Sequence, residues 1–223
     1  TMIITRNPDS RGGRAAEMVF NVETPDGCNS PGLRSYYASM VGIAALGAYI
    51  GVCSGRLSKA DFHRTGQEIA GYTNQFMEDL ERIDEEMFAE AVRMKELRKF
   101  EVIGDGNGGS SAQFVEQKFI ECSGVYCDHT TSEEFAHISY FFRGPEEFGT
   151  VVLVNGADKS LGRMKDTING CLAQHRPTLV VTDLEASEFE VRQRDTGDVD
   201  NFYGIAEMGV NSMEKAGRAS VCR

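Results

Sequence analysis

The chain has 223 residues, of which 41% are hydrophobic and 26% charged, so its composition is that of a globular protein with one good core or two small ones. Its formal net charge of −11 argues against nucleic acid or an anionic membrane surface as the main partner. An acidic protein can still hold a local cationic pocket, so this charge is compatible with a phosphorylated small molecule.

The cysteines and the longest apolar run bear on the location of the protein. There are six cysteines, with no C-x-x-C pair and no zinc-type spacing: Cys28, Cys53, Cys122, Cys127, Cys171 and Cys222. This scatter is typical of reduced thiols and predicts a cytoplasmic protein. The most apolar run, Met40–Cys53, has about 14 residues, fewer than the roughly 20 that a membrane-spanning helix needs, so we expect no membrane contact.

The first part of the chain predicts a short α/β segment followed by helices. We expect strands at Met2–Thr5 and Met18–Val22, with a turn and a short helix between them. From Leu33 to Val52 small and apolar residues dominate, which predicts a buried helix.

Ser58 and Asp61 form a capping-box pattern at the start of a long amphipathic helical region. This region extends to about Leu97, and the stretch Gly71–Asn74 could interrupt it. We interpret its many charges as a solvated face.

The central stretch, Phe100 to His137, predicts a strand–helix–strand unit. Phe100–Ile103 is a strand, and a glycine-rich loop leads into a helix that Ser110 would cap, with Gln113 completing a capping box. The apolar face of that helix has helical spacing and consists of Ala112, Val115, Phe119 and Cys122. Val125–Cys127 restarts a strand, and a polar loop that contains Glu133, Glu134 and His137 follows.

The rest of the chain continues the alternation. Thr150–Val154 and Thr178–Thr182 are strands around a helix at Lys159–Leu172, and Tyr203–Lys215 is expected to form one helix. This order predicts a doubly wound α/β fold with a mostly parallel sheet and right-handed crossovers. We expect four segments: 1–32, a helical linker region at 33–98, an α/β half at 99–186, and a C-terminal tail at 187–223.

The glycine-rich loop from Gly104 to Gly109 matches G-x-G-x-x-G between a strand and a helix, and Asp128 ends the next strand. Taken alone, this pattern favours a nucleotide-binding domain. Asp105, however, places a negative charge inside the loop that would hold a pyrophosphate, so a tight turn is the simpler interpretation.

A second set of residues is a more specific indication of function than the glycine-rich loop: Lys118, Glu121, Glu134 and His137. By themselves they could be a surface ion pair and an unrelated loop histidine.

Their spacing, however, resembles the second half of a double sugar-isomerase (SIS) domain. This family includes the isomerase domain of glucosamine-6-phosphate synthase and the fructosamine-6-phosphate deglycases. There a helix carries a Lys and then a Glu three residues on. A Glu-x-x-His loop follows, with its His sixteen residues after the first Glu. Here Ile138-Ser139 replaces the Gly-Pro that follows the His in the deglycases.

The resemblance continues toward the start of the chain. Thr5 to Ser10 resembles the Thr-Asn-x-x-x-Ser turn of the first SIS half, and the Leu33–Tyr37 stretch resembles the helix start of the family, with Arg34 at its Lys position. The resemblance implies that Thr5, Ser10, Arg34 and Ser35 bind substrate. The first strand and the Ser/Thr-rich phosphate loop of the family would lie before Thr1, and its reactive C-terminal Lys has no match after Ser187.

The resemblance implies a sugar-phosphate isomerase or deglycase that acts on phosphorylated amino sugars or fructosamines. Glu121 would be the proton-transfer base, and His137 the ring-opening or leaving-group acid. Lys118 would orient Glu121, and Glu134 would hold His137 in one tautomer. The chemistry requires no metal and no cofactor, and the family implies a homodimer that shares its sites. Two alternatives stay open: a non-catalytic SIS module that binds a sugar phosphate, and, more weakly, a nucleotide-binding domain.

Overall fold

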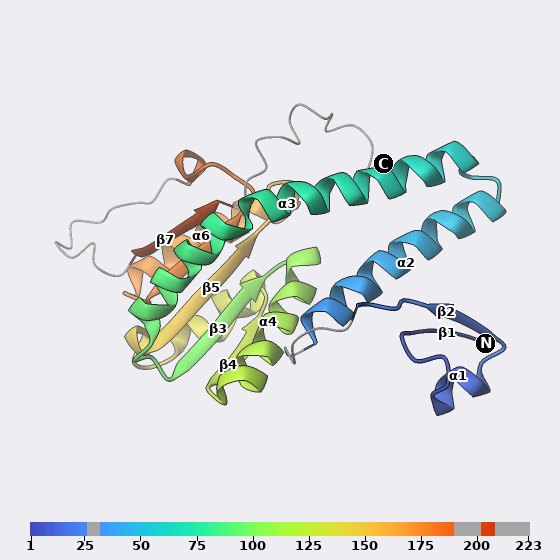
Figure 1. Cartoon of the computed structure of the whole chain (residues 1–223). Coiled ribbons are helices and arrows are strands. Elements are labelled where there is room, and N and C mark those ends of the chain that lie inside the picture. Colours follow the sequence, from blue (N-terminus) through green and yellow to red (C-terminus); the bar gives the residue numbers. More distant parts are fainter. Residues whose placement is uncertain (26–31, 190–201, 208–223) are drawn as a thin grey trace. The chain divides into compact units, whose positions relative to one another are not determined.

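The computed structural model describes residues 1–25, 32–189 and 202–207 (Figure 1). Two cysteines, Cys28 and Cys222, lie outside these ranges, as does most of the helix expected at 203–215. The chain divides into two compact units, Thr1–Glu78 and Asp79–Arg223, and the boundary falls inside the region 33–98 expected from sequence to be helical. Each unit is described by itself.

The second unit is built on a parallel sheet. Its strands are β3 (Lys99–Gly104), β4 (Tyr126–Thr130), β5 (Phe148–Val154), β6 (Thr178–Thr182) and β7 (Phe202–Glu207). They lie in the order β4-β3-β5-β6-β7, and every neighbouring pair is parallel. The chain adds β4 on one side of β3 and then crosses to add β5 on the other side. The strand order therefore reverses between β3 and β5, as in other doubly wound sheets.

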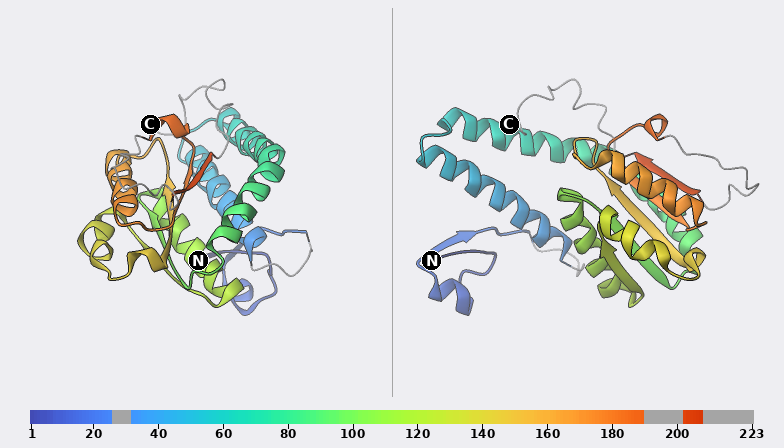
Figure 2. Two further views of the ribbon diagram at one scale, coloured as in Figure 1. Left: turned by 90° about the vertical axis from the view of Figure 1, so that its left-hand side faces the viewer. Right: turned by 180° about the vertical axis from the view of Figure 1, so that it is seen from behind.

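Helices cover both faces of this sheet, which confirms the expected doubly wound architecture. One face packs against α4 (Asn107–Ser123) and the last turns of α3 (Lys59–Met94), through a cluster that includes Met94, Val102 and Ala112. The other face packs against α5 (Ser132–His137) and α6 (Leu161–Ala173), through a cluster that includes Phe135 and Ile168. Figure 1 views the first face, and the right panel of Figure 2 views the second.

Strands β5 and β6 form where the sequence is rich in β-branched and apolar residues. Val151, Val152 and Val154 of β5 and Val180 of β6 are all buried, because helices cover both sides of these strands. Short 3-10 helices occupy the connections: η1 (Ser139–Phe141), η2 (Pro145–Glu147) and η3 (Ala186–Glu188).

A buried ion pair lies inside this unit. Arg176, in the connection between α6 and β6, has no exposed surface, and its Nη1 lies 2.8 Å from Oε2 of the buried Glu101 in β3. The guanidinium carbon lies 5.3 Å from the ring centre of Phe135 and 5.1 Å from that of Phe148. The charge is thus held between two aromatic faces and one carboxylate, which partly offsets its desolvation.

The first unit is smaller and more open. Strands β1 (Met2–Thr5) and β2 (Met18–Asn21) pair in parallel, with the short helix α1 (Arg11–Ala15) between them, as expected. Helix α2 (Leu33–Cys53) packs on these strands through Gly42, where an added Cβ would lie 2.6 Å from a methyl group of Val22. The expected capping box starts α3: Ser58 Oγ accepts a hydrogen bond from the Asp61 N–H, and Asp61 Oδ2 accepts one from the Ser58 N–H.

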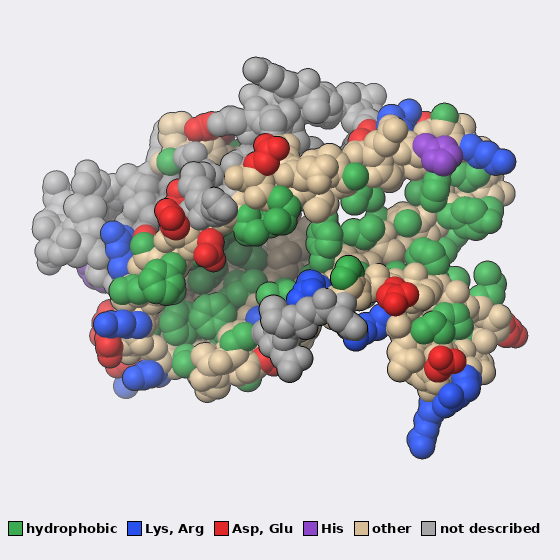
Figure 3. Space-filling view, viewed as in Figure 1, with side chains coloured by type: hydrophobic (Ala, Val, Ile, Leu, Met, Phe, Trp, Pro, Cys, Tyr) green, Lys and Arg blue, Asp and Glu red, His purple; other side chains and the backbone are tan. Residues whose placement is uncertain are grey.

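Helix α2 corrects one expectation from sequence. Within this chain it is mostly exposed rather than buried, and its large apolar side chains include Met40, Ile43 and Ile50 at the surface (Figure 3). It has 21 residues, so by length and composition alone it could span a membrane, although core helices and signal sequences pass the same test. The shorter run Met40–Cys53 therefore does not exclude such a helix.

Four local expectations differ from the structure. Helix α3 is continuous through Gly71–Asn74. Helix α4 begins at Asn107, with Gly106 rather than Ser110 as its N-cap, so the Ser110–Gln113 capping box is wrong. The polar loop expected around Glu133 and His137 is the helix α5. Residues 202–207 form the strand β7 instead of the start of a helix, and this strand extends the sheet into the expected C-terminal tail.

Candidate functional site

The expected pair on helix α4 is present. Lys118 and Glu121 are one turn apart, and Lys118 Nζ donates to Glu121 Oε2 at 2.5 Å. The ammonium group also lies 5.2 Å from the ring centre of Phe114, and the Lys118 side chain is largely buried. Half of the Glu121 side chain is exposed, so its carboxylate is held in one position but remains open to a ligand.

His137 ends the helix α5, which a capping box begins. Thr131 Oγ1 accepts a hydrogen bond from the Glu134 N–H at 3.1 Å, and Glu134 Oε2 accepts one from the Thr131 N–H at 3.1 Å. This Thr-x-x-Glu pattern is visible in the sequence and predicts a helix start there. Hydrogen bonds from the Thr131 backbone and hydroxyl lower the pKa of Glu134 below its usual value.

The partner of His137 is not the one expected. Nε2 of His137 lies 3.0 Å from Oε1 of Glu133, one helical turn earlier, while Glu134 is engaged by the capping box. The expectation that Glu134 holds the imidazole is therefore wrong for this chain. The other carboxylate oxygen of Glu133 lies 2.7 Å from Nη2 of Arg163 on α6, so a second helix holds the residue that contacts His137.

The four expected catalytic residues do not meet within one chain. Helix α4 packs on one face of the sheet and α5 on the other, as Ala112 and Phe135 show by lying in different core clusters. Glu121 lies in the last turn of α4, at the end where β4 begins, whereas α5 follows the end of β4. Among the described residues, Lys118 contacts Glu121 and Glu133 contacts His137, and no contact joins Glu121 to His137.

The expected substrate-binding residues lie in the first unit, in turns and helix starts. Thr5 Oγ1 accepts from the Asn7 N–H at 3.1 Å, and Ser10 Oγ caps α1 by accepting from the Gly13 N–H at 3.1 Å. At the start of α2, Arg34 Nη1 donates to the Pro25 carbonyl at 3.4 Å, and Ser35 Oγ donates to the Gly32 carbonyl at 2.9 Å. These side chains thus shape the local backbone.

The glycine-rich loop is a tight turn with acidic surroundings. An added Cβ at Gly104 would lie 2.4 Å from the Gly108 carbonyl oxygen, and Gly106 has a φ of +52°, which favours glycine. Asp105 binds Ser132 at the start of α5 through both carboxylate oxygens. The carboxylate of Asp158 approaches Gly106 so closely that an added Cβ there would lie 2.3 Å from Oδ2. The loop therefore presents carboxylates where a phosphate would need donors.

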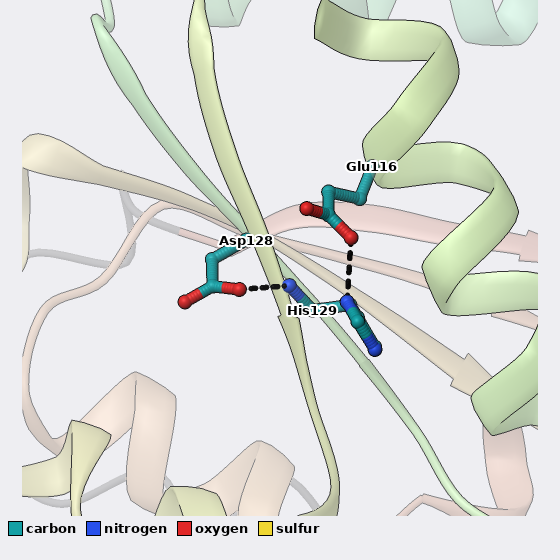
Figure 4. A group of neighbouring side chains, drawn as sticks. All are labelled: Glu116, Asp128 and His129. Carbon is teal, nitrogen blue, oxygen red and sulfur yellow. Dashed lines mark hydrogen bonds and ion pairs between the residues drawn. The ribbon is translucent and has the colours of Figure 1, made fainter.

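A further cluster was not expected from sequence. Glu116 on α4 and Asp128 and His129 on β4 place ligand atoms within 4.8 Å of one another (Figure 4). His129 Nδ1 lies 2.5 Å from Glu116 Oε2, and Asp128 Oδ1 accepts from the His129 backbone N–H at 2.9 Å. These groups satisfy one another without an ion. Glu116 and His129 are thirteen residues apart, one on a helix and one on a strand, so the sequence alone did not indicate that they meet.

Comparison with known proteins reveals similarity in structure but not in sequence. No family model matches the chain, and none of the curated proteins does. The C-terminal domain of glucosamine-fructose-6-phosphate aminotransferase from Francisella tularensis superposes with a TM-score of 0.76 at 16% identity, over 92% of this chain and 55% of that one. A Clostridium difficile 630 protein assigned as a phosphosugar isomerase gives 0.68 at 15% identity, over 92% and 54%.

A Salmonella typhimurium LT2 protein assigned as sugar-binding also gives a TM-score of 0.68, at 14% identity, over 91% of this chain and 60% of its own. The chain thus spans little more than half the length of these structural relatives. The parallel sheet, its covering helices and these superpositions agree with the resemblance drawn from the spacing of Lys118, Glu121, Glu134 and His137. We conclude that this chain has the fold of the sugar-isomerase (SIS) domains.

Proposed function

We propose that the protein is a sugar-phosphate isomerase or deglycase that acts on a phosphorylated amino sugar or fructosamine. The observation that carries this proposal is the Lys118–Glu121 pair, in which a half-exposed carboxylate is held by a largely buried ammonium group. A fixed carboxylate that a ligand can reach is what proton transfer between adjacent sugar carbons requires. The SIS fold supports the substrate class.

The proposed chemistry uses one base and one acid. Glu121 takes the proton from the carbon next to the carbonyl and returns it to the carbonyl carbon, while a proton moves from the hydroxyl oxygen to the carbonyl oxygen, so the sugar is neither oxidised nor reduced overall. Lys118 keeps the carboxylate in position and balances its charge. His137 gives a proton to the ring oxygen on opening or, in a deglycase, to the amine that leaves when water adds to its carbon. No step needs a metal or a cofactor.

Arg34 is the proposed source of positive charge for the phosphate, and Thr5, Ser10 and Ser35 are the proposed hydroxyl donors. All four lie in the first unit, at the end of β1, the start of α1 and the start of α2. Helix starts also provide backbone N–H groups for an anion. We expect Arg34→Ala to raise KM for a phosphorylated sugar far more than it lowers kcat.

We propose that the active protein is a homodimer. Glu121 and His137 lie on opposite faces of the sheet in one chain, so a site that uses both takes His137 from a second copy. The exposed apolar side chains of α2, among them Ile43 and Ile50, are the kind of surface that subunit interfaces cover. The free cysteines Cys53, Cys122, Cys127 and Cys171 fit the proposed cytoplasmic location.

A non-catalytic SIS module that binds a sugar phosphate is the second candidate, because His137 is already paired with Glu133 and is not followed by Gly-Pro. A nucleotide-binding role is less favoured, because Asp105 and Asp158 bring negative charge to the glycine-rich loop. Thermal-shift titration with hexosamine phosphates, fructosamine phosphates and NAD separates sugar-phosphate binding from nucleotide binding, and turnover of the same sugar phosphates separates the enzyme from the non-catalytic module. Stabilisation by NAD alone would support the nucleotide-binding role.

The decisive experiment tests Glu121 and His137 separately and then together. Glu121→Gln keeps the shape of the side chain but cannot accept the proton, so we expect turnover of fructosamine or glucosamine 6-phosphate to fall by about 10²–10⁴. His137→Asn should also reduce turnover. Glu85→Gln, at an exposed position in α3, is the matched control and should leave it unchanged.

Mixing the two inactive variants tests the shared site. If His137 acts across a dimer, one of the two sites in a mixed dimer keeps both wild-type residues, so part of the activity should return. Full activity of either single variant would overturn the proposal. If both variants are inactive, their subunits exchange on mixing, and no activity returns, the shared site is wrong.

A further inference from the structure

His137 contacts the carboxylate of Glu133, which also contacts Arg163, so three side chains connect the helices α5 and α6. Oε1 of Glu133 lies 3.0 Å from Nε2 of His137, and Oε2 of Glu133 lies 2.7 Å from Nη2 of Arg163. Glu133 and His137 are four residues apart on α5, whereas Arg163 lies on α6. The carboxylate is therefore engaged at both oxygens, by one residue from each helix.

The contact decides which imidazole nitrogen carries the proton. An ionised carboxylate has only acceptor sites, so a hydrogen bond at Nε2 requires that Nε2 carry its hydrogen. In the neutral imidazole the other nitrogen, Nδ1, then has a free lone pair. Within the described part of the chain, no residue forms a hydrogen bond with Nδ1 of His137, so this nitrogen is available to a ligand.

We propose that Glu133, clamped by Arg163, is a positioning residue that fixes His137 as the Nε2–H tautomer and makes Nδ1 the atom that exchanges a proton with the substrate. The inference rests on the proposed role of His137 and adds the atom and the two residues that select it. In the protonated imidazole Nδ1–H is the acid, and after transfer Nδ1 is left with the lone pair while Nε2–H stays on Glu133.

The alternative is an ordinary exposed ion pair on a helix surface, which contributes little to stability. Two observations favour positioning. The helices that carry the three residues are anchored in one core, through Phe135 of α5 and Met164 and Ile168 of α6. Arg163 also takes up the second carboxylate oxygen, which limits the rotation of Glu133 and with it the direction of the imidazole.

The direct test is nitrogen NMR of the full chain with 15N-labelled histidine. We expect neutral His137 to be held as the Nε2–H tautomer in the wild type and to relax toward the mixture of free imidazole in Glu133→Ala. Arg163→Ala should produce the same change to a smaller extent. A wild-type His137 with its proton on Nδ1, or with the mixture of free imidazole, overturns the inference whether or not the protein is an enzyme.

Kinetics supply the second readout. Glu133→Ala should lower kcat on the order of tenfold with little change in KM, and Glu133→Gln, which keeps an acceptor oxygen at the same reach, should restore part of the loss. Glu85→Ala is the control. If His137→Asn is inactive but Glu133→Ala keeps the wild-type kcat, positioning is wrong while the proposed function stands. If His137→Asn keeps full turnover, the proposed role of His137 fails, and the inference fails with it.

Discussion

The two units of this chain differ in how far their apolar side chains are buried. The second unit places its strands between two layers of helices, and Val102, Ile103, Val152 and Val180 in its sheet have no exposed surface. The first unit has a two-stranded sheet, α2 and the first part of α3, which contacts α2 through the rings of Tyr49 and Phe62, and Ile43 of α2 is still 60% exposed. One unit has a closed core, and the other presents apolar side chains to its surroundings.

This difference shows that apolar composition does not by itself reveal what covers a helix. The α2 sequence is as apolar as a core helix, but the described chain provides few groups to pack against it. A two-stranded sheet is also only marginally stable without further packing. The first unit therefore gains most from a second copy of the chain or another apolar partner, whereas in the second unit helices already cover both faces of the described sheet.

The largest effect is expected at the buried ion pair of the second unit. Glu101→Ala leaves the Arg176 charge buried without its carboxylate, so the free energy of unfolding should fall by about 3–5 kcal/mol. Denaturant unfolding followed by far-UV circular dichroism measures this. The double variant Glu101→Leu, Arg176→Met removes both charges and should lose much less. A decrease of less than about 1 kcal/mol in the free energy of unfolding of Glu101→Ala would contradict a paired site that excludes water.

The same substitution in the two units gives the sharpest comparison. Ile103→Ala opens a cavity in β3 and should cost about 2–5 kcal/mol, whereas Ile43→Ala on α2 should change the stability of an isolated chain by no more than about 0.5 kcal/mol. If a second copy covers α2, the cost of Ile43→Ala should grow with protein concentration, which sedimentation and thermal unfolding at several concentrations can detect. If Ile103→Ala and Ile43→Ala lower the free energy of unfolding equally at every protein concentration, the difference between the two units is wrong.

A smaller effect is expected at the start of α5. Thr131→Ala removes the side-chain half of the capping box and should cost about 1 kcal/mol. It should also raise the pKa of Glu134, because the Thr131 hydroxyl is one of the hydrogen bonds that lower it. Carbon-detected NMR titration of the Glu134 carboxyl group checks this. Thr65→Ala, inside α3 with its hydroxyl bonded to the Asp61 carbonyl, is a control that leaves this capping box intact.

The smallest effect concerns the capping box of α3 in the first unit. The side-chain and backbone hydrogen bonds from Ser58, assisted by Arg64, lower the pKa of Asp61 from 3.8 to about 2. Because the folded pKa is the lower one, this contribution to stability is fully present above about pH 4 and is lost as the pH falls through about 2. Ser58→Ala should raise the pKa of Asp61 toward 3.8, as followed by its carboxyl resonance. An unchanged pKa would show that the cap does not form.

The sequence predicted β5 and β6 well because both are rich in β-branched and apolar residues and their connections carry glycine and polar residues. Its failures are local. The start of α4 depends on the backbone of Gly106, which has no side chain to signal a cap. Helix α5 has six residues, too few for an apolar period, although the Thr131–Glu134 box marks its start. The burial of α2 could not be read from composition, because burial depends on what lies opposite.

In the candidate site, too, some contacts could be predicted from the sequence and one could not. The Lys118–Glu121 contact follows from a separation of three residues on one helix, so the sequence could predict it. The pairing of His137 with Glu133 follows just as directly from a separation of four once α5 is known to be a helix. The contact of Glu133 with Arg163 joins two helices that are distant in sequence, and only the packing of α5 against α6 reveals it.

The position of β4 at the outer edge of the described sheet has a consequence for how copies of the chain can associate. Its unpaired backbone groups would be a template for adding a foreign strand, which is the first step toward fibrous aggregates. The strand is only five residues long and carries Asp128 and His129, with the Glu116 carboxylate beside it. Short length and charge are the usual protection of such an edge. Growth by strand addition is therefore opposed at β4, and association is directed to the helical surfaces.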